Sequence, residues 1–82
     1  MDVKTFLETV NENPIQQYAS HESFTDVTFA TFKAVQVGED VEVYGCWMNI
    51  NYASPIDYDT IVIKGSDIHK WKFHPKFPKR NA

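Results

Sequence analysis

The spacing of apolar residues changes near residue 24, and this change restricts the chain to folds that combine a helix with a sheet. Four residues near the N-terminus follow the i, i+3, i+4, i+7 pattern of an amphipathic helix: Val3, Phe6, Leu7 and Val10. From Phe24 onwards the apolar residues recur mostly at every second position, the period of a β-strand. With 82 residues, the chain has room for one domain. We therefore predict an α+β fold, with one or two N-terminal helices packed on a three- to four-stranded antiparallel meander sheet.

The expected boundaries of these elements follow from capping residues, prolines and turn residues. We expect the first helix within residues 2–12, capped by Asp2 and ended ahead of Pro14. Asn13 and Pro14 also suit the N-cap and first position of a second, short helix. Strands are expected at residues 24–37, with a bulge near Ala30–Thr31, and at residues 41–52, 59–64 and 68–73.

Charge is divided unevenly along the chain. Residues 1–63 hold ten acidic and two basic residues, a net charge of −8, whereas residues 64–82 hold six basic residues and one acidic residue, a net charge of +5. We expect residues 1–73 to form the domain and residues 74–82 to form an extended, basic, proline-containing tail. Such a division favours a function in binding a charged partner.

Catalytic and metal-binding motifs are missing from the sequence. It contains no P-loop, no Gly-x-Gly-x-x-Gly, no Gly-x-Ser-x-Gly and no His-Glu-x-x-His, so we do not expect an enzyme or a bound cofactor. His69 and His74 with Cys46 or Asp67 lack the paired spacing of a zinc site, so no metal is expected. Cys46 lies in an apolar strand, which predicts a buried, unreactive thiol rather than a nucleophile.

The expected compartment follows from the single cysteine and from the absence of long apolar runs. One cysteine permits no internal disulfide, and no stretch has the roughly 20 apolar residues of a membrane span. We expect a cytoplasmic protein, in a bacterium or in the cytosol of an infected host, with no membrane partner.

Five acidic residues are candidates for a surface that binds a basic protein: Glu39, Asp40, Glu42, Asp57 and Asp59. Clustered carboxylates speed the encounter with a basic partner and help to select it. The alternative for these residues is plain solvated surface charge, which keeps many proteins soluble.

The strand expected at residues 41–52 is apolar on both faces, and one helix covers only one face of a sheet. Four residues of this strand are candidates for an aromatic binding face: Tyr44, Trp47, Met48 and Tyr52. We expect Tyr44, Met48 and Tyr52, or else Trp47 on the opposite face, to be partly exposed in the monomer and buried by a protein partner or a second copy of the chain.

The C-terminal segment alternates cations with aromatic residues, which is a pattern that suits single-stranded nucleic acid. Its candidate contacts are Lys70, Trp71, Lys72, Lys76, Phe77, Lys79 and Arg80. The alternative is structural, because lysines protect an edge strand from aggregation and aromatic residues fill a core.

These features together favour a small acidic protein-binding module. We expect an inhibitor or adaptor that occludes the surface of a protein partner, of the type that phages encode against host proteins or bacteria use as immunity proteins. The alternatives are a single-stranded RNA- or DNA-binding protein and a homodimeric structural protein.

Overall fold

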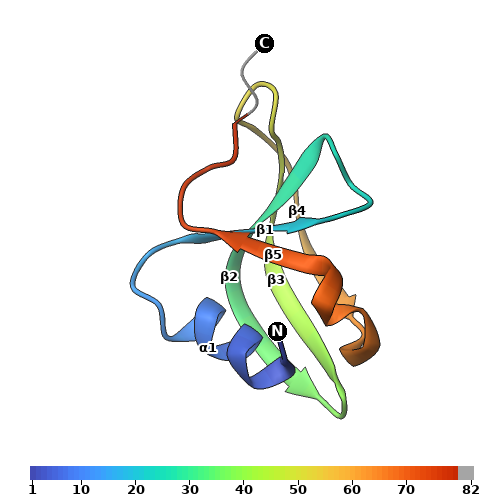
Figure 1. Cartoon of the computed structure of the whole chain (residues 1–82). Helices are drawn as coiled ribbons and strands as arrows, with labels where there is room; N and C mark the ends of the chain where they lie inside the picture. The colour runs from blue at the N-terminus through green and yellow to red at the C-terminus, as the bar shows by residue number, and fades with distance from the viewer. Residues whose placement is uncertain (80–82) are drawn as a thin grey trace.

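One helix packs on a five-stranded antiparallel sheet in the computed structural model, which describes residues 1–79 (Figure 1). The elements follow in the order α1 (Val3–Asn11), β1 (Gln17–His21), β2 (Val27–Val37), β3 (Asp40–Asn49), β4 (Ser54–Ile63), the 3-10 helix η1 (Gly65–Lys70) and β5 (Trp71–His74). The sheet order is β4-β3-β2-β1-β5, so β1 to β4 form a meander and β5 joins beside β1. The α+β class is confirmed, and the sheet has one strand more than the upper number predicted.

Helix α1 is held at both ends by side-chain hydrogen bonds. The backbone N–H of Thr5 donates to Asp2 Oδ1 over 2.8 Å, which is the predicted N-cap and lowers the pKa of Asp2. At the other end the Asn11 amide donates to the Ala34 carbonyl over 2.8 Å and accepts from the Ala34 N–H over 2.9 Å. These two bonds fasten the end of the helix to strand β2.

The predicted second helix is wrong. The Ile15 N–H donates to Asn13 Oδ1 over 3.0 Å, a local turn that replaces a helical start, and the chain continues directly into β1. Strand β1 bonds to β2 on one side and to β5 on the other. Two neighbouring strands therefore outweigh a weak local preference for helix at Asn13 and Pro14.

All four predicted strands have different bounds in the structure, and β2 begins at Val27, three residues after its predicted start. Strand β3 ends at Asn49, so Tyr52 lies in a turn, and β4 begins at Ser54, five residues ahead of its predicted start. The strand predicted at residues 68–73 is divided, because its first three residues belong to η1 and only Trp71–His74 form β5. A 3-10 turn buries Ile68 in the core, which a straight strand from that position does not explain.

The predicted bulge in the long strand is confirmed, close to its expected place. Thr31 pairs with Gly45 and Lys33 pairs with Tyr44, so Phe32 is the extra residue on β2. Before the bulge Phe29 points into the core, and after it Ala34 does. The bulge thereby restores the inward row of side chains and gives Phe32 a position on the other side of the sheet.

The core lies between one face of the sheet and the two helices (Figure 1). We call this side the covered face; its buried members are Phe6, Ala19, Phe29, Ala34, Val41, Val43, Ile63, Ile68 and Trp71. A side chain at Gly45 would clash with the Ala30 carbonyl and with the Phe29 ring, so this glycine makes room for Phe29. We call the opposite side, which no helix covers within residues 1–79, the open face.

Candidate binding surfaces

Three aromatic side chains from three neighbouring strands meet on the open face. Phe32 of β2, Tyr44 of β3 and Tyr58 of β4 have ring centroids 5.7, 6.0 and 6.5 Å apart, and the two tyrosine rings are stacked at 19°. Their exposed fractions are 44%, 47% and 63%, which is high for rings that contact one another. We refer to Phe32, Tyr44 and Tyr58 as the aromatic trio.

Strand register explains how the aromatic trio is assembled. Tyr58 lies opposite Cys46, which lies opposite Ala30, and Tyr44 is the neighbour of Lys33 after the bulge. Cys46 and Ala30 are buried and form the floor of this surface, whereas the trio stands above it. The predicted burial of the Cys46 thiol is confirmed, and its low reactivity stays a prediction.

The predicted aromatic binding face, which comprised Tyr44, Trp47, Met48 and Tyr52, is not a single surface. Tyr44 and Met48 lie on the open face, but alternation along β3 places Trp47 on the covered face, where it packs on Phe29 with centroids 4.8 Å apart. Tyr52 is 77% exposed in the turn between β3 and β4. Sequence reasoning missed two members of the trio, because they join Tyr44 only through the bulge and the pairing of β4.

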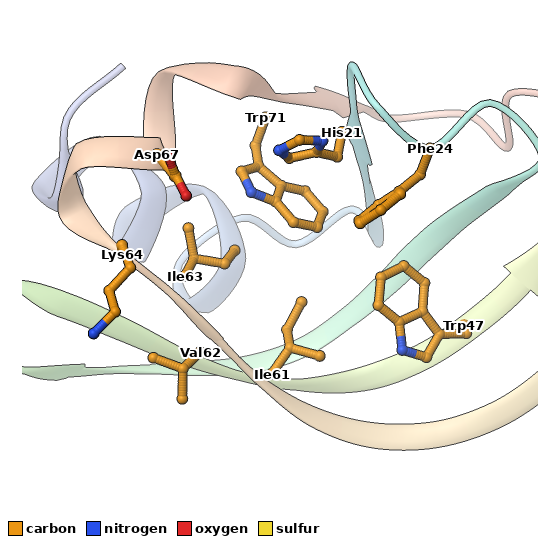
Figure 2. Close-up of a pocket in the computed structure, with 9 residues that line it drawn as sticks. All are labelled: His21, Phe24, Trp47, Ile61, Val62, Ile63, Lys64, Asp67 and Trp71. Carbon is orange, nitrogen blue, oxygen red and sulfur yellow. The ribbon is translucent and has the colours of Figure 1, made fainter.

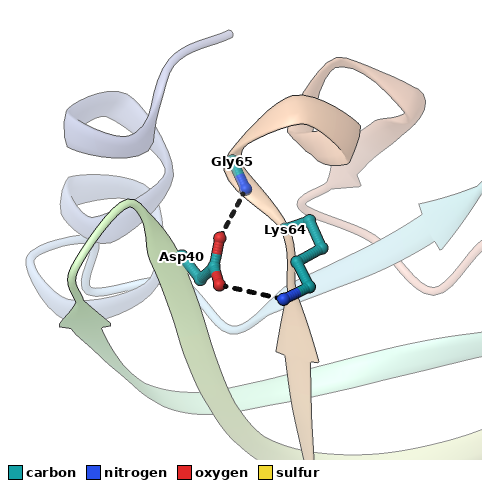
Figure 3. A network of polar contacts seen from close by, with 3 residues as sticks. All are labelled: Asp40, Lys64 and Gly65. Atoms are coloured by element: carbon teal, nitrogen blue, oxygen red, sulfur yellow. Dashed lines mark hydrogen bonds and ion pairs between the residues drawn. The ribbon is translucent and has the colours of Figure 1, made fainter.

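Asp40, one of the predicted partner-binding acids, has a role inside the molecule (Figure 3). Its Oδ1 accepts the Gly65 N–H over 3.1 Å, and its Oδ2 lies 3.4 Å from Lys64 Nζ. The Gly65 hydrogen bond and then the Lys64 ammonium lower the pKa of Asp40. Asp40 therefore fastens the start of β3 to the junction between β4 and η1.

The other four predicted acids are divided between the two faces and a turn. Glu42 lies on the open face between Val35 and Val62, and Glu39 lies in the turn ahead of β3. Asp57 and Asp59 lie on the opposite side: Asp57 is directly opposite Trp47, and Asp59 Oδ2 accepts the indole N–H of Trp47 over 3.3 Å. The five acids are therefore not one continuous patch.

The basic C-terminal segment is also divided. Trp71 is buried in the core, Lys70 lies 3.6 Å from Asp67, and Phe77 packs edge-on against Tyr18 of the open face with centroids 5.4 Å apart. Lys72 of β5 pairs with Ser20 of β1, and the Ser20 hydroxyl is hydrogen-bonded to the Thr28 hydroxyl. Lys76 and Lys79 follow β5 and are exposed. Arg80 lies outside the described residues.

A hollow of about 190 Å³ beside β1 and β5 is lined by two lysines and three histidines together with one carboxylate, Glu22. Its lining comprises Ser20, His21, Glu22, His69, Lys70, Lys72 and His74. No group of three or more metal-ligating side chains occurs among residues 1–79. Within the same residues no helix is long and apolar enough to cross a membrane.

No family model, curated protein or solved structure matches this chain. The physical character of its surfaces is therefore the basis for any functional assignment.

Proposed function

We propose that this protein is a protein-binding module that docks a partner on the open face of its sheet. The observation that carries this proposal is the aromatic trio, whose three rings contact one another and still expose about half of their surface. Aromatic residues are enriched in the cores of protein interfaces, and a contiguous exposed apolar patch marks an interaction site more often than an accident.

Mutual packing prepares the trio for binding. Each ring is already held by its neighbours on adjacent strands, so little side-chain entropy remains to be lost when a partner covers it. Val35 and Val62, both about half exposed or more, extend the apolar surface along β2 and β4. The extended surface is of the kind from which a few aromatic anchors supply most of the binding energy.

The charges around the trio suit a partner with basic groups at the edge of the contact. Glu42 lies between the two valines and Glu39 in the adjoining turn, and neither carboxylate forms a hydrogen bond or ion pair within residues 1–79. Rim charges of this kind act mainly on the rate of encounter. The protein would act by occupying its partner's surface, as an inhibitor or an adaptor.

Variants at the trio test this proposal against a matched control. A partner captured from the native host is measured by isothermal titration against the wild type, Tyr44→Ala, Tyr58→Ala and Tyr52→Ala. We expect a loss of about 2 kcal/mol or more at Tyr44 or Tyr58, and little change at Tyr52, which is the more exposed tyrosine and lies outside the trio. Equal effects at all three positions would refute docking on the open face.

A second candidate function, binding of single-stranded nucleic acid, is favoured by the hollow beside β1 and β5, whose lining includes Lys70 and Lys72. The buried Trp71 is not available to stack on a base, so the trio would have to provide the stacking platform. Fluorescence anisotropy with an oligouridine and an oligothymidine separates the two functions. Tight binding at physiological salt that is lost in the double variant Lys70→Ala/Lys72→Ala would favour nucleic acid over a protein partner.

The third alternative, a homodimer through the open face, is tested by the same variants. Sedimentation velocity of the wild type at several concentrations gives the oligomeric state. A dimer that dissociates in Tyr44→Ala, and not in Tyr52→Ala, would identify a second copy of the chain as the partner.

A further inference from the structure

A hollow of about 300 Å³ on the covered face is lined by aromatic residues at the end of the sheet that α1 leaves open (Figure 2). It lies on the other side of β3 and β4 from the aromatic trio. Figure 2 shows that the side chains of His21, Phe24, Trp47, Ile61, Ile63, Asp67 and Trp71 face the hollow, whereas those of Val62 and Lys64 point away from the rings. Its volume suits a small molecule or one long side chain.

Three of these rings form steeply inclined walls. Phe24 meets Trp47 at 81° and Trp71 at 73°, with centroid distances of 6.1 and 6.5 Å. His21 packs against Phe24 and Trp71, and Phe29 packs behind Trp47. The walls are thus supported by their neighbours, and part of Phe24 remains exposed.

Carboxylates surround this aromatic enclosure. Asp67 lines it and lies 3.6 Å from Lys70 at an exposed ion pair. Asp59 accepts the indole N–H of Trp47, and Asp57 lies directly opposite Trp47 on β4. A hydrogen bond from the indole to an anion increases the electron density of the ring, which strengthens its attraction for a cation. The one ammonium in the lining, Lys64, points away from the rings in Figure 2 and is engaged with Asp40.

We propose that this hollow binds an alkylated ammonium group, of the kind carried by choline or by trimethyllysine. The methyl groups of such a cation suit the apolar floor of Ile61 and Ile63, and its diffuse charge suits ring faces better than a tight ion pair. The carboxylates beside Trp47 supply long-range attraction without a direct bond. This site is separate from the open face, so its test is independent of the test of the proposed function.

The test compares two ligands of the same shape, choline and its uncharged isostere 3,3-dimethylbutan-1-ol. Each is titrated into the wild-type protein, with tryptophan fluorescence and two-dimensional NMR as readouts. We expect saturable choline binding that shifts the indole resonances of Trp47 and Trp71, and affinity for the alcohol lower by about fivefold or more. Equal affinity for the two ligands, or no saturable binding of choline, would overturn the proposal.

Variants locate the site. Phe24→Leu removes a wall that is partly exposed, so the fold should persist, and it should weaken choline binding about threefold or more. Asp67→Asn should weaken choline and leave the alcohol unchanged, whereas the control Glu42→Gln, on the open face, should change neither. If Glu42→Gln weakens choline as much as Asp67→Asn does, the attraction is only that of the net charge and the site is refuted.

Acetylated trimethyllysine amide, measured beside choline, distinguishes the two sources of such a cation. Tighter binding of the amino acid identifies a protein side chain as the ligand, and tighter binding of choline identifies a free small molecule.

Discussion

The two faces of the sheet are built from the same strands and differ in what covers them. On the covered face Phe29, Val41 and Val43 are fully buried beneath α1 and η1, whereas on the open face the aromatic trio is about half exposed. The same alternation along β2, β3 and β4 supplies both sets. The covered face therefore provides stability, and the open face has apolar surface available for a partner.

The comparison is sharpest at two phenylalanines of one strand. Phe29 is completely buried and Phe32, three residues on, is 44% exposed. We predict that Phe29→Ala lowers the free energy of unfolding by about 3–5 kcal/mol, because it leaves a cavity in the core. Phe32→Ala should lower it by about 1 kcal/mol or less. Urea denaturation measures both, and similar losses would show that the open face also supports the fold.

Glycine 45 tests how tightly the covered face is packed. Gly45→Ala places a methyl group against the Ala30 carbonyl and the Phe29 ring, so we expect a loss of about 1–3 kcal/mol in the free energy of unfolding. Gly38→Ala is the matched control, since it meets no atom within 4 Å and bears only the strain of a φ of 62°. Thermal denaturation should rank Gly45→Ala as the more destabilising variant. The reverse order would mean that the Phe29 ring moves aside to accommodate the added methyl group.

The labelling rate of the Cys46 thiol measures how well the buried layer beneath the open face is protected from solvent. We expect a thiol reagent to label the native protein far more slowly than the unfolded chain, because Cys46 is buried between its strand neighbours. Tyr58 is the neighbour of Cys46 on β4, so Tyr58→Ala should speed labelling several-fold while Tyr52→Ala leaves the rate unchanged. Labelling of the wild type at the unfolded rate would contradict the placement of this thiol.

The smallest expected effect is on the loss of folding stability at acidic pH. The folded pKa of Asp40 lies below its ordinary value of 3.8, mainly because the Gly65 N–H donates to the carboxylate. Its contribution to stability is therefore present above pH 3.8 and is lost as the pH falls through the lower folded pKa. Asp40→Asn should reduce the loss of stability below pH 4, with Glu39→Gln as control. The Asp40 side chain is half-buried and its ammonium partner Lys64 is exposed, so solvent screening should keep the difference small. Identical acid unfolding curves for Asp40→Asn and Glu39→Gln would show that Asp40 does not contribute to the loss of stability in acid.

The candidate surfaces were only partly predictable from the sequence. The separation of Tyr44 and Met48 from Trp47 onto opposite faces of the strand is correctly predicted, and Asp57 and Asp59 are exposed, while their binding of a partner stays a prediction. The aromatic trio and the aromatic hollow were not predicted, because each joins residues from three or more separate elements. Periodicity separates Trp47 from Tyr44 and Met48 but does not say which of the two faces a helix covers, so it could not decide between these two sets of candidates.

The sequence by itself determined the elements whose pattern is local. The helical spacing after Asp2, the alternation around Val41 and Val43, and the change of register near Thr31 each involve residues close together in the chain, so periodicity is enough to predict them. Only the tertiary structure decided β1, the division between η1 and β5, and the role of Asp40. Strand β1 has little alternation of its own and exists because β2 and β5 pair with it, and Asp40 meets Gly65 across 25 positions of sequence. Such contacts depend on which distant segments become neighbours, and that depends on burial of the whole core rather than on any local run of residues.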